Sequence, residues 1–207
     1  MTDIYHVSKM ATYISFDIGT KNLATCILEY DASYYRAYKI IKWDKVVLGK
    51  TTEDAVKTLM PYLVKKASQV PNIHNTTVLI ERQCNRNAKA FALQYVVYGY
   101  FLSVCQKVVL VDAKIKPLKK TGRERKKESV EVFVDKYASK VSDYWATFLQ
   151  QQRKKDDYTD TFLQIVGYIK KHPPPPVQEE DEEDEDEDEG DEEAEEDDEE
   201  DDDDDEI

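Results

Sequence analysis

Residues 12–47 consist of short apolar stretches in which strand-forming side chains alternate with polar ones. Residues 12–18 and 23–30 are rich in β-branched and aromatic residues, and Gly19-Thr20-Lys21-Asn22 separates them. This arrangement predicts a β-hairpin. Tyrosines, isoleucines and Trp43 continue the pattern through residues 34–47, so we expect a third strand that completes an antiparallel meander.

From residue 52 to residue 67 the apolar positions change to the spacing of an α-helix. Residues 76–82 then form a short apolar strand pattern, residues 86–104 a long helical pattern, and residues 108–112 a fifth strand pattern. Three strands, a helix, a strand, a helix and a strand follow one another in the order of the ribonuclease-H-like fold. We therefore predict an α/β protein with a five-stranded mixed sheet and flanking helices.

The C-terminal part of this region contains mainly helical patterns. Residues 114–127 include Pro117, Gly122 and many basic residues, so we expect an exposed loop that enters a helix running to about residue 140. A further helix is predicted over residues 144–152. The last helix begins near Asp156 and ends before the prolines at 173–176, which cannot continue a helix.

The distribution of charge divides the chain into three parts. We predict a folded domain over residues 1–172, a proline-rich spacer over 173–178 and a disordered acidic tail over 179–207. The formal net charge is −14, but the tail holds 26 of the 43 acidic residues and none of the 29 basic ones. The rest of the chain therefore has a net charge of +12, which is typical of a nucleic-acid-binding domain.

The sequence also argues against a membrane protein or a secreted protein. The longest apolar run, residues 91–105, is interrupted by Gln94 and Ser103 and is too short to span a bilayer. The first ten residues have no continuous apolar core, so no secretory signal is expected. Three widely spaced cysteines indicate reduced thiols in an intracellular compartment.

Acidic residues stand at the ends of two predicted strands and at the start of the last helix. Asp17 and Glu81 end strands, while Asp157 and Asp160 lie three residues apart and share one helical face. Asp17 could alternatively cap a turn, and Asp156 could simply favour the helix dipole. If the fold brings Asp17, Glu81, Asp157 and Asp160 together, the four carboxylates repel one another strongly unless divalent cations bind. Hard oxygen ligands suit Mg²⁺, with Mn²⁺ as a substitute. Two such ions support phosphodiester cleavage.

Basic residues form two groups near these acids. A dense run in the predicted loop could be an ordinary solvated face, but its position beside the predicted crevice favours contact with DNA phosphates. Its members are Lys119, Lys120, Arg123, Arg125, Lys126 and Lys127. Lys154 and Lys155 precede the acidic pair and either screen it or steady a phosphate as negative charge develops in the transition state. We place Lys155 among the catalytic candidates and Lys154 among the DNA-binding ones.

Three motifs resemble those of RuvC-type Holliday junction resolvases, especially the poxvirus and fungal mitochondrial branch. They are Phe16-Asp17-Ile18-Gly19, Leu79-Ile80-Glu81-Arg82-Gln83 and Lys154-Lys155-Asp156-Asp157-Tyr158-Thr159-Asp160. The likeness extends from residue 12 to residue 171. It implies a homodimeric, Mg²⁺-dependent endonuclease that cuts two symmetry-related strands of a four-way DNA junction. A large DNA virus would be its source, and it would act at viral replication sites in the cytoplasm or nucleus of the host cell.

The resemblance also implies roles for individual residues. Asp17, Glu81, Asp157 and Asp160 correspond to the four catalytic and metal-binding carboxylates, and Arg82 and Gln83 would lie beside the scissile phosphate. The helix over residues 86–104 would form part of the dimer interface.

Other functions remain open from the sequence. The stretch Asp17-Ile18-Gly19-Thr20 also resembles the first phosphate loop of actin-like sugar kinases, although the chain has no room for their second lobe. Another ribonuclease-H-like nuclease and a non-catalytic junction-binding protein are further alternatives. The acidic tail could compete with DNA for the basic domain of its own chain, solubilise the protein, or bind basic partner proteins.

Overall fold

The computed structural model of the protein describes residues 10–31 and 37–173. The predicted acidic tail and most of the proline-rich spacer lie outside these residues, so the expectations for them remain predictions. Within the described part, no helix is both long enough and apolar enough to cross a membrane.

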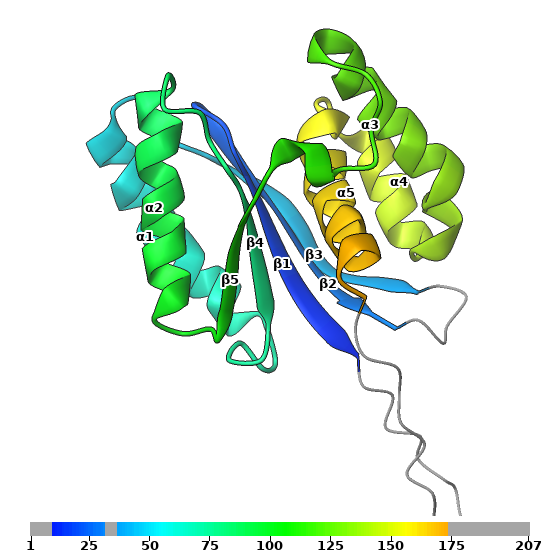
Figure 1. Ribbon diagram of the computed structural model, residues 1–207, viewed down its shortest axis with the longest axis horizontal. Helices are drawn as coiled ribbons and strands as arrows, with labels where there is room; N and C mark the ends of the chain where they lie inside the picture. Colours follow the sequence, from blue (N-terminus) through cyan, green and yellow to red (C-terminus); the bar gives the residue numbers. More distant parts are fainter. Residues whose placement is uncertain (1–9, 32–36, 174–207) are drawn as a thin grey trace, which may run out of the picture. The chain divides into compact units, whose positions relative to one another are not determined.

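A five-stranded mixed sheet forms the centre of the domain, as the hydrophobic pattern predicted (Figure 1). Strands β1 (Ala11–Ile18), β2 (Asn22–Tyr30) and β3 (Tyr38–Val47) form the antiparallel meander. Strands β4 (Thr77–Glu81) and β5 (Lys107–Val111) continue the sheet parallel to β1, in the order β3-β2-β1-β4-β5. Because β1, β4 and β5 run in the same direction, their carboxyl ends meet at one edge of the sheet.

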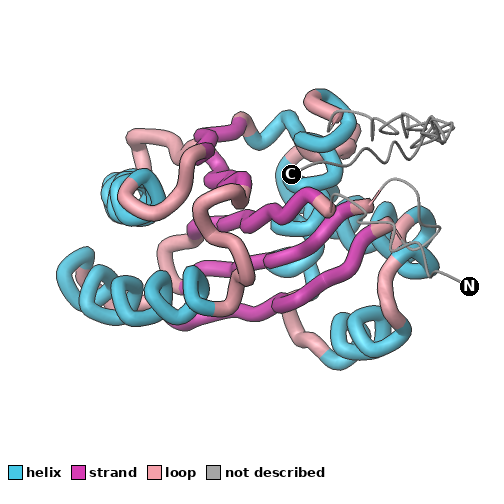
Figure 2. Tube along the Cα trace, turned by 90° about the horizontal axis from the view of Figure 1, so that it is seen from below, coloured by secondary structure: helices cyan, strands magenta, loops and turns pink. Residues whose placement is uncertain are grey.

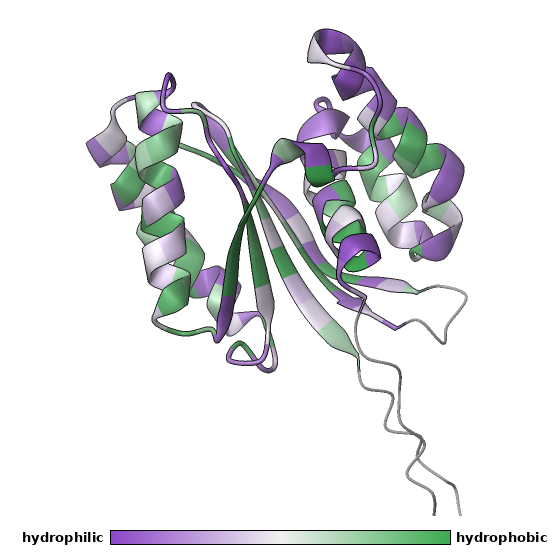
Figure 3. Cartoon of the chain, viewed as in Figure 1, coloured by the Kyte–Doolittle hydropathy of each residue, from purple (hydrophilic) through white to green (hydrophobic). Residues whose placement is uncertain are grey.

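Helices cover both faces of this sheet (Figures 1 and 2). Helices α1 (Thr52–Ser68) and α2 (Ala88–Leu102) lie on one face. Helix α5 (Lys155–Lys171) lies on the other, with α3 (Gly122–Lys136) and α4 (Asp143–Gln151) packed outside it. Figure 3 shows hydrophobic residues along the strands and on the sides of α2 and α5 that face them. Each face of the sheet therefore has its own apolar core.

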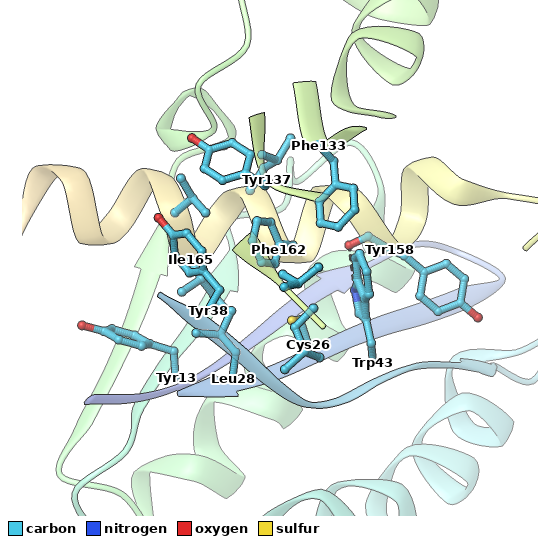
Figure 4. Close-up of a cluster of buried hydrophobic side chains, with 14 of the residues drawn as sticks. Tyr13, Cys26, Leu28, Tyr38, Trp43, Phe133, Tyr137, Tyr158, Phe162 and Ile165 are labelled. Atoms are coloured by element: carbon cyan, nitrogen blue, oxygen red, sulfur yellow. Dashed lines mark hydrogen bonds between the residues drawn. The ribbon is translucent and has the colours of Figure 1, made fainter. Parts of the chain in front are cut away.

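The core between the sheet and α5 is rich in aromatic rings (Figure 4). Trp43 of β3 is 1% exposed and packs against Phe133 and Phe162. Its indole N–H lies 2.9 Å from the carbonyl oxygen of Tyr158 and 3.1 Å from the hydroxyl of Thr161, and it donates to both. A buried indole N–H that finds acceptors fixes the position of the partner element. Trp43 thus fastens the first turns of α5 to β3.

The expectation of an exposed loop over residues 114–127 was wrong in part. A short 3₁₀ turn, Ala113–Ile115, follows β5, and α3 already begins at Gly122. Gly122 has a φ of +58°, a conformation that a residue without a Cβ adopts readily at this entry. Helix α3 also ends earlier than predicted, at Lys136, and a second 3₁₀ turn, Ala138–Lys140, completes the segment.

Candidate active site

Strands β1 and β4 each place a carboxylate at the same edge of the sheet. Phe16 of β1 is opposite Ile80 of β4 in the parallel register, so Asp17 and Glu81 follow on neighbouring strands. Side chains alternate between the two faces of a strand, and both residues therefore point to the face that α5 covers. Helix α5 packs across β1 and β2 and carries Asp157 and Asp160 in its first two turns.

The electrostatics of Asp17 show that these four carboxylates share one site. Burial raises the pKa of Asp17 to about 7. Lys116 opposes this shift, whereas the negative charges of Glu81, Asp160 and Asp157 add to it. Like charges act in this way only when they are close together, because each disfavours ionisation of its neighbours.

Lys116 is the counter-charge on one side of the cluster. Its Nζ lies 2.7 Å from Glu81 Oε2 and 2.9 Å from Asp160 Oδ2, and its side chain is only 2% exposed. Burial disfavours its ammonium form, but the charges of Asp17, Glu81 and Asp160 outweigh burial and raise the pKa of Lys116. Lys116 therefore remains positively charged between two elements, β4 and α5, that are joined through it.

Lys45 provides a second counter-charge from the opposite side. Its Nζ lies 3.0 Å from Asp157 Oδ2, and both side chains are about one-fifth exposed (19% and 21%). The same ammonium is 5.1 Å from the centre of the Tyr158 ring. Two lysines from different elements thus neutralise part of the carboxylate charge.

The donor set fits a hard divalent cation. Asp160 Oδ1 is a buried oxygen that has no hydrogen-bond donor within residues 10–31 and 37–173, although its partner oxygen contacts Lys116. Buried carboxylate oxygens are normally satisfied, and an oxygen that is not is available to an ion. Among the described residues, no three acidic, histidine or cysteine side chains are arranged so that they could hold a metal ion as they stand. The ammonium groups of Lys116 and Lys45 contact carboxylate oxygens of Glu81, Asp157 and Asp160 instead.

Most of the predicted DNA-binding residues lie at the start of α3 or just before it. The side chains of Lys119, Lys120, Arg123 and Lys127 are exposed. The backbone N–H groups of Lys119 and Lys120 donate to the carboxylate of Glu128 at 2.8–3.0 Å, which fixes the turn that presents their side chains.

Two other members of this group already have protein partners. The guanidinium of Arg125 is half-buried and donates to the carbonyl oxygen of Ala113, so Arg125 braces the connection between β5 and α3. Lys126 Nζ lies 2.8 Å from Asp156 Oδ2. Asp156 therefore has an ion-pair partner in addition to the helix dipole that the sequence suggested.

Lys154 and Lys155 begin α5 but do not contact the four carboxylates through any ion pair among the described residues. Lys155 instead lines a hollow of about 410 Å³ with Lys126, Lys127 and Arg153. This hollow lies beside the start of α5, and its lining also includes the acidic residues Glu131 and Asp156. It extends the basic surface of α3 towards the carboxylates.

The residues after Glu81 occupy different positions. Arg82 is exposed, and its backbone N–H donates to the carbonyl oxygen of Val111 at 2.8 Å. The side-chain amide of Gln83 donates to the carbonyl oxygen of Glu81 at 3.1 Å, and its backbone N–H donates to Gln94. Gln83 thus holds the end of β4 against α2.

The sequence interpretation missed Lys116 and Lys45. Lys116 stands between Ile115 and Pro117 in a lysine-rich stretch, and only these apolar neighbours distinguish it from the exposed lysines nearby. Lys45 belongs to the polar positions of a strand, which usually face solvent.

Comparisons with known proteins agree with this architecture. A Holliday junction resolvase of fowlpox virus (strain NVSL) is 29% identical over 158 residues, which cover 75% of this chain and 90% of the relative. Resolvase OPG149 of monkeypox virus is 28% identical over 160 residues, with coverage of 75% and 73%. The crystal structure of a fowlpox virus resolvase with substrate Holliday junction DNA matches with a TM-score of 0.60 at 26% identity and covers 79% of this chain and 99% of that chain.

A more distant structure shows the same fold. The yeast mitochondrial Holliday junction resolvase is 13% identical and matches with a TM-score of 0.51, covering 77% of this chain and 78% of that chain. The family model described as Poxvirus A22 protein matches residues 12–171, which include all of the sheet except Ala11, the α-helices α1–α5 and the four clustered carboxylates. The chain therefore belongs to the Poxvirus A22 protein family.

Proposed function

We propose that this protein is a Mg²⁺-dependent endonuclease that resolves four-way DNA junctions. The observation that supports this function best is the cluster of Asp17, Glu81, Asp157 and Asp160 at the edge of the sheet, in a chain of the Poxvirus A22 family. A fowlpox virus relative is named a Holliday junction resolvase. Carboxylate clusters of this kind suit phosphodiester hydrolysis because they bind the cations that this chemistry uses.

The four carboxylates would hold the divalent cations, with Mg²⁺ the expected ion and Mn²⁺ a substitute. Bound there, the ions supply an activated water and stabilise the leaving oxygen. The protein itself keeps the carboxylates in place: Trp43 fixes the start of α5, and Lys116 joins Glu81 to Asp160. The buried ammonium of Lys116 keeps the two carboxylates together through its ion pair with each of them.

DNA phosphates would contact the exposed basic residues around this cluster. Lys119, Lys120, Arg123 and Lys127 present four cations near the start of α3. Arg82 follows Glu81 directly and is exposed, which suits a phosphate near the cleavage point. Lys126, Lys154 and Lys155 would extend this surface along the start of α5. Arg125 would support it indirectly through its contact with Ala113.

We further propose that the protein acts as a homodimer through α2. Tyr95 and Leu102 on this helix are large apolar residues that are 50% and 52% exposed. A two-fold-symmetric protein suits paired cuts in a junction that is itself nearly two-fold symmetric. The exposed apolar side of α2 is the surface on which two copies would meet.

The site of action would be the infected cell, because the curated relatives come from poxviruses. Viral DNA is replicated there, and branched intermediates would be the substrate.

A cleavage assay tests the proposed function. The full-length protein is incubated with a synthetic four-way junction, a linear duplex and an RNA/DNA hybrid, each with Mg²⁺ or with EDTA. We expect Mg²⁺-dependent, paired nicks in the junction, little cleavage of the duplex, and loss of cleavage in the Asp17→Asn variant with junction binding retained. Preferential cleavage of the hybrid would assign the site to another ribonuclease-H-like activity, and binding without cleavage would indicate a non-catalytic junction-binding protein.

A further inference from the structure

Lys45 forms a contact that the proposed chemistry would have to break. Its ammonium lies 3.0 Å from Asp157 Oδ2, one of the oxygens that a divalent cation at this cluster would use. An ammonium and a metal ion both neutralise a carboxylate, but one carboxylate oxygen cannot bind both at full strength at the same time. The two cations therefore compete for Asp157.

The position of Lys45 is set by the fold rather than by chance contact at the surface. It follows Trp43 by two residues on β3, so both side chains point towards α5. Trp43 is hydrogen-bonded to Tyr158, the residue after Asp157. The backbone positions of Lys45 and Asp157 are consequently fixed relative to each other, whereas the four-carbon stem of lysine lets its ammonium move.

The two lysines of the cluster, Lys116 and Lys45, differ in how freely their ammonium groups can move. Lys116 is 2% exposed and is held by two carboxylates, Glu81 and Asp160. Lys45 has 19% of its side chain exposed and contacts Asp157 alone among these acids. Lys116 is thus enclosed, whereas Lys45 is free to leave its carboxylate and reach an incoming anion.

We infer that Lys45 is a placeholder cation for Asp157, which makes metal and DNA binding interdependent. This inference rests on the proposed function. Without DNA, Lys45 occupies Asp157 and weakens metal binding. When a DNA phosphate enters, Lys45 pairs with it and releases Asp157 to the metal. By thermodynamic linkage, metal then strengthens junction binding by the same factor as the junction strengthens metal binding.

The ordinary alternative is that the pair is only a stabilising salt bridge. Solvent-exposed ion pairs contribute little to stability, typically about 0–1 kcal/mol, and this pair is about one-fifth exposed. That alternative predicts no effect on metal affinity when Lys45 is neutralised, or a weaker affinity if the site loosens. Competition predicts the opposite sign, a tighter metal site, and the two explanations are therefore separable by measurement.

Metal binding without DNA is the first test. Tb³⁺ luminescence, sensitised by Trp43 and Tyr158 beside Asp157, is titrated in the full-length protein and reversed with Mg²⁺. Residues 179–207 contain no aromatic side chain, so a Tb³⁺ ion bound to the acidic tail has no sensitiser within that segment. We expect Lys45→Met to bind Mg²⁺ about fivefold to tenfold more tightly than wild type, at the lower end of the range for coupled sites. Lys45→Arg should remain close to wild type because it keeps the charge.

Junction binding is the second test. Anisotropy of a labelled junction is measured with EDTA and with Ca²⁺, and a gel confirms that the DNA is intact. We expect Ca²⁺ to strengthen junction binding of the wild type several-fold more than that of Lys45→Met. Lys42→Met is the matched control, because Lys42 lies on the same strand but points to the opposite face, near Lys66. It should behave as wild type in both titrations.

Two outcomes would overturn the inference in distinguishable ways. A folded Lys45→Met protein with wild-type or weaker Mg²⁺ affinity in the absence of DNA would remove the placeholder role and leave the proposed nuclease function intact. Wild-type protein without any Mg²⁺-reversible signal would instead argue against a metal site at Asp157, and both proposals would then fall. If Lys45→Met did not fold, Lys45→Gln would be measured in the same way.

Discussion

Replacing Gly167 by alanine should displace Lys116 without changing any charged residue. Gly167 lies on α5, where the helix meets the 3₁₀ turn after β5. A Cβ at this position would overlap the carbonyl oxygen of Ile115 and lie 2.7 Å from its carbonyl carbon. Ile115 directly precedes Lys116, so any retreat of the turn moves the base of the buried lysine. The glycine is thus a requirement of close packing between α5 and this turn.

The size of the effect follows from this distance. Ordinary contacts to a Cβ begin at 3.4 Å, and the atoms that would be displaced are backbone atoms that cannot rotate away. The turn must therefore shift on the order of 1 Å, and a misplacement of this size near reacting groups lowers rates by about 100-fold. Overpacking should also cost about 1–3 kcal/mol of unfolding free energy. We therefore expect folded Gly167→Ala protein to cleave the junction much more slowly than wild type, which the loss of stability by itself would not explain.

The assay compares single-turnover junction cleavage with urea unfolding for three proteins: wild type, Gly167→Ala and Val166→Ala. Val166 is fully buried in the core beneath α5, and its truncation should destabilise the protein by about 1–3 kcal/mol without adding an atom against Ile115. Val166→Ala should therefore cleave at a near wild-type rate under conditions where it is folded. Wild-type cleavage by folded Gly167→Ala, or an equal loss in both variants, would refute the reasoning.

Three further predictions concern charge and anchoring. Lys116→Met should reduce junction cleavage by about 100-fold or more, because Glu81 and Asp160 lose the ammonium that keeps them together; a rate above one-tenth of wild type would contradict this. On the opposite face of the sheet, Asp44→Ala should cost about 3–5 kcal/mol in urea unfolding, because the ammonium of Lys66, which is 1% exposed, loses its carboxylate and keeps the neutral amide oxygen of Gln69 as an acceptor. Lys66→Met should cost less, since water reaches the 30% exposed carboxylate that remains, and the reverse order would be inconsistent with this explanation. Trp43→Phe should lose about 1–3 kcal/mol and raise hydrogen exchange at the start of α5, because the carbonyl oxygen of Tyr158 loses the indole N–H that ties it to β3 and keeps the Thr161 hydroxyl of its own helix; unchanged exchange there would argue against the anchoring role.

The sequence was sufficient for the elements and for the acids at their ends. Strand and helix periods are local properties, and they predicted the five strands and the helices other than α3 to within a few residues. The positions of Asp17 and Glu81 at strand ends, and of Asp157 and Asp160 on one helical face, follow from the same periods. Three motifs in a characteristic order added the family resemblance, which the match to the Poxvirus A22 family confirms. The assignment of these acids to catalysis remains a proposal.

The tertiary structure alone decided which cations meet those acids. Lys45 and Asp157 lie 112 residues apart, and Lys116 and Asp160 lie 44 apart, so no local pattern relates them. Their pairing depends on how α5 crosses the sheet, and this crossing depends in turn on Trp43 and on the absence of a side chain at Gly167. Residues 114–127 illustrate the same limit. Their composition predicted an exposed loop, but packing against α5 buried Lys116, whose ammonium is stabilised there by ion pairs with Glu81 and Asp160.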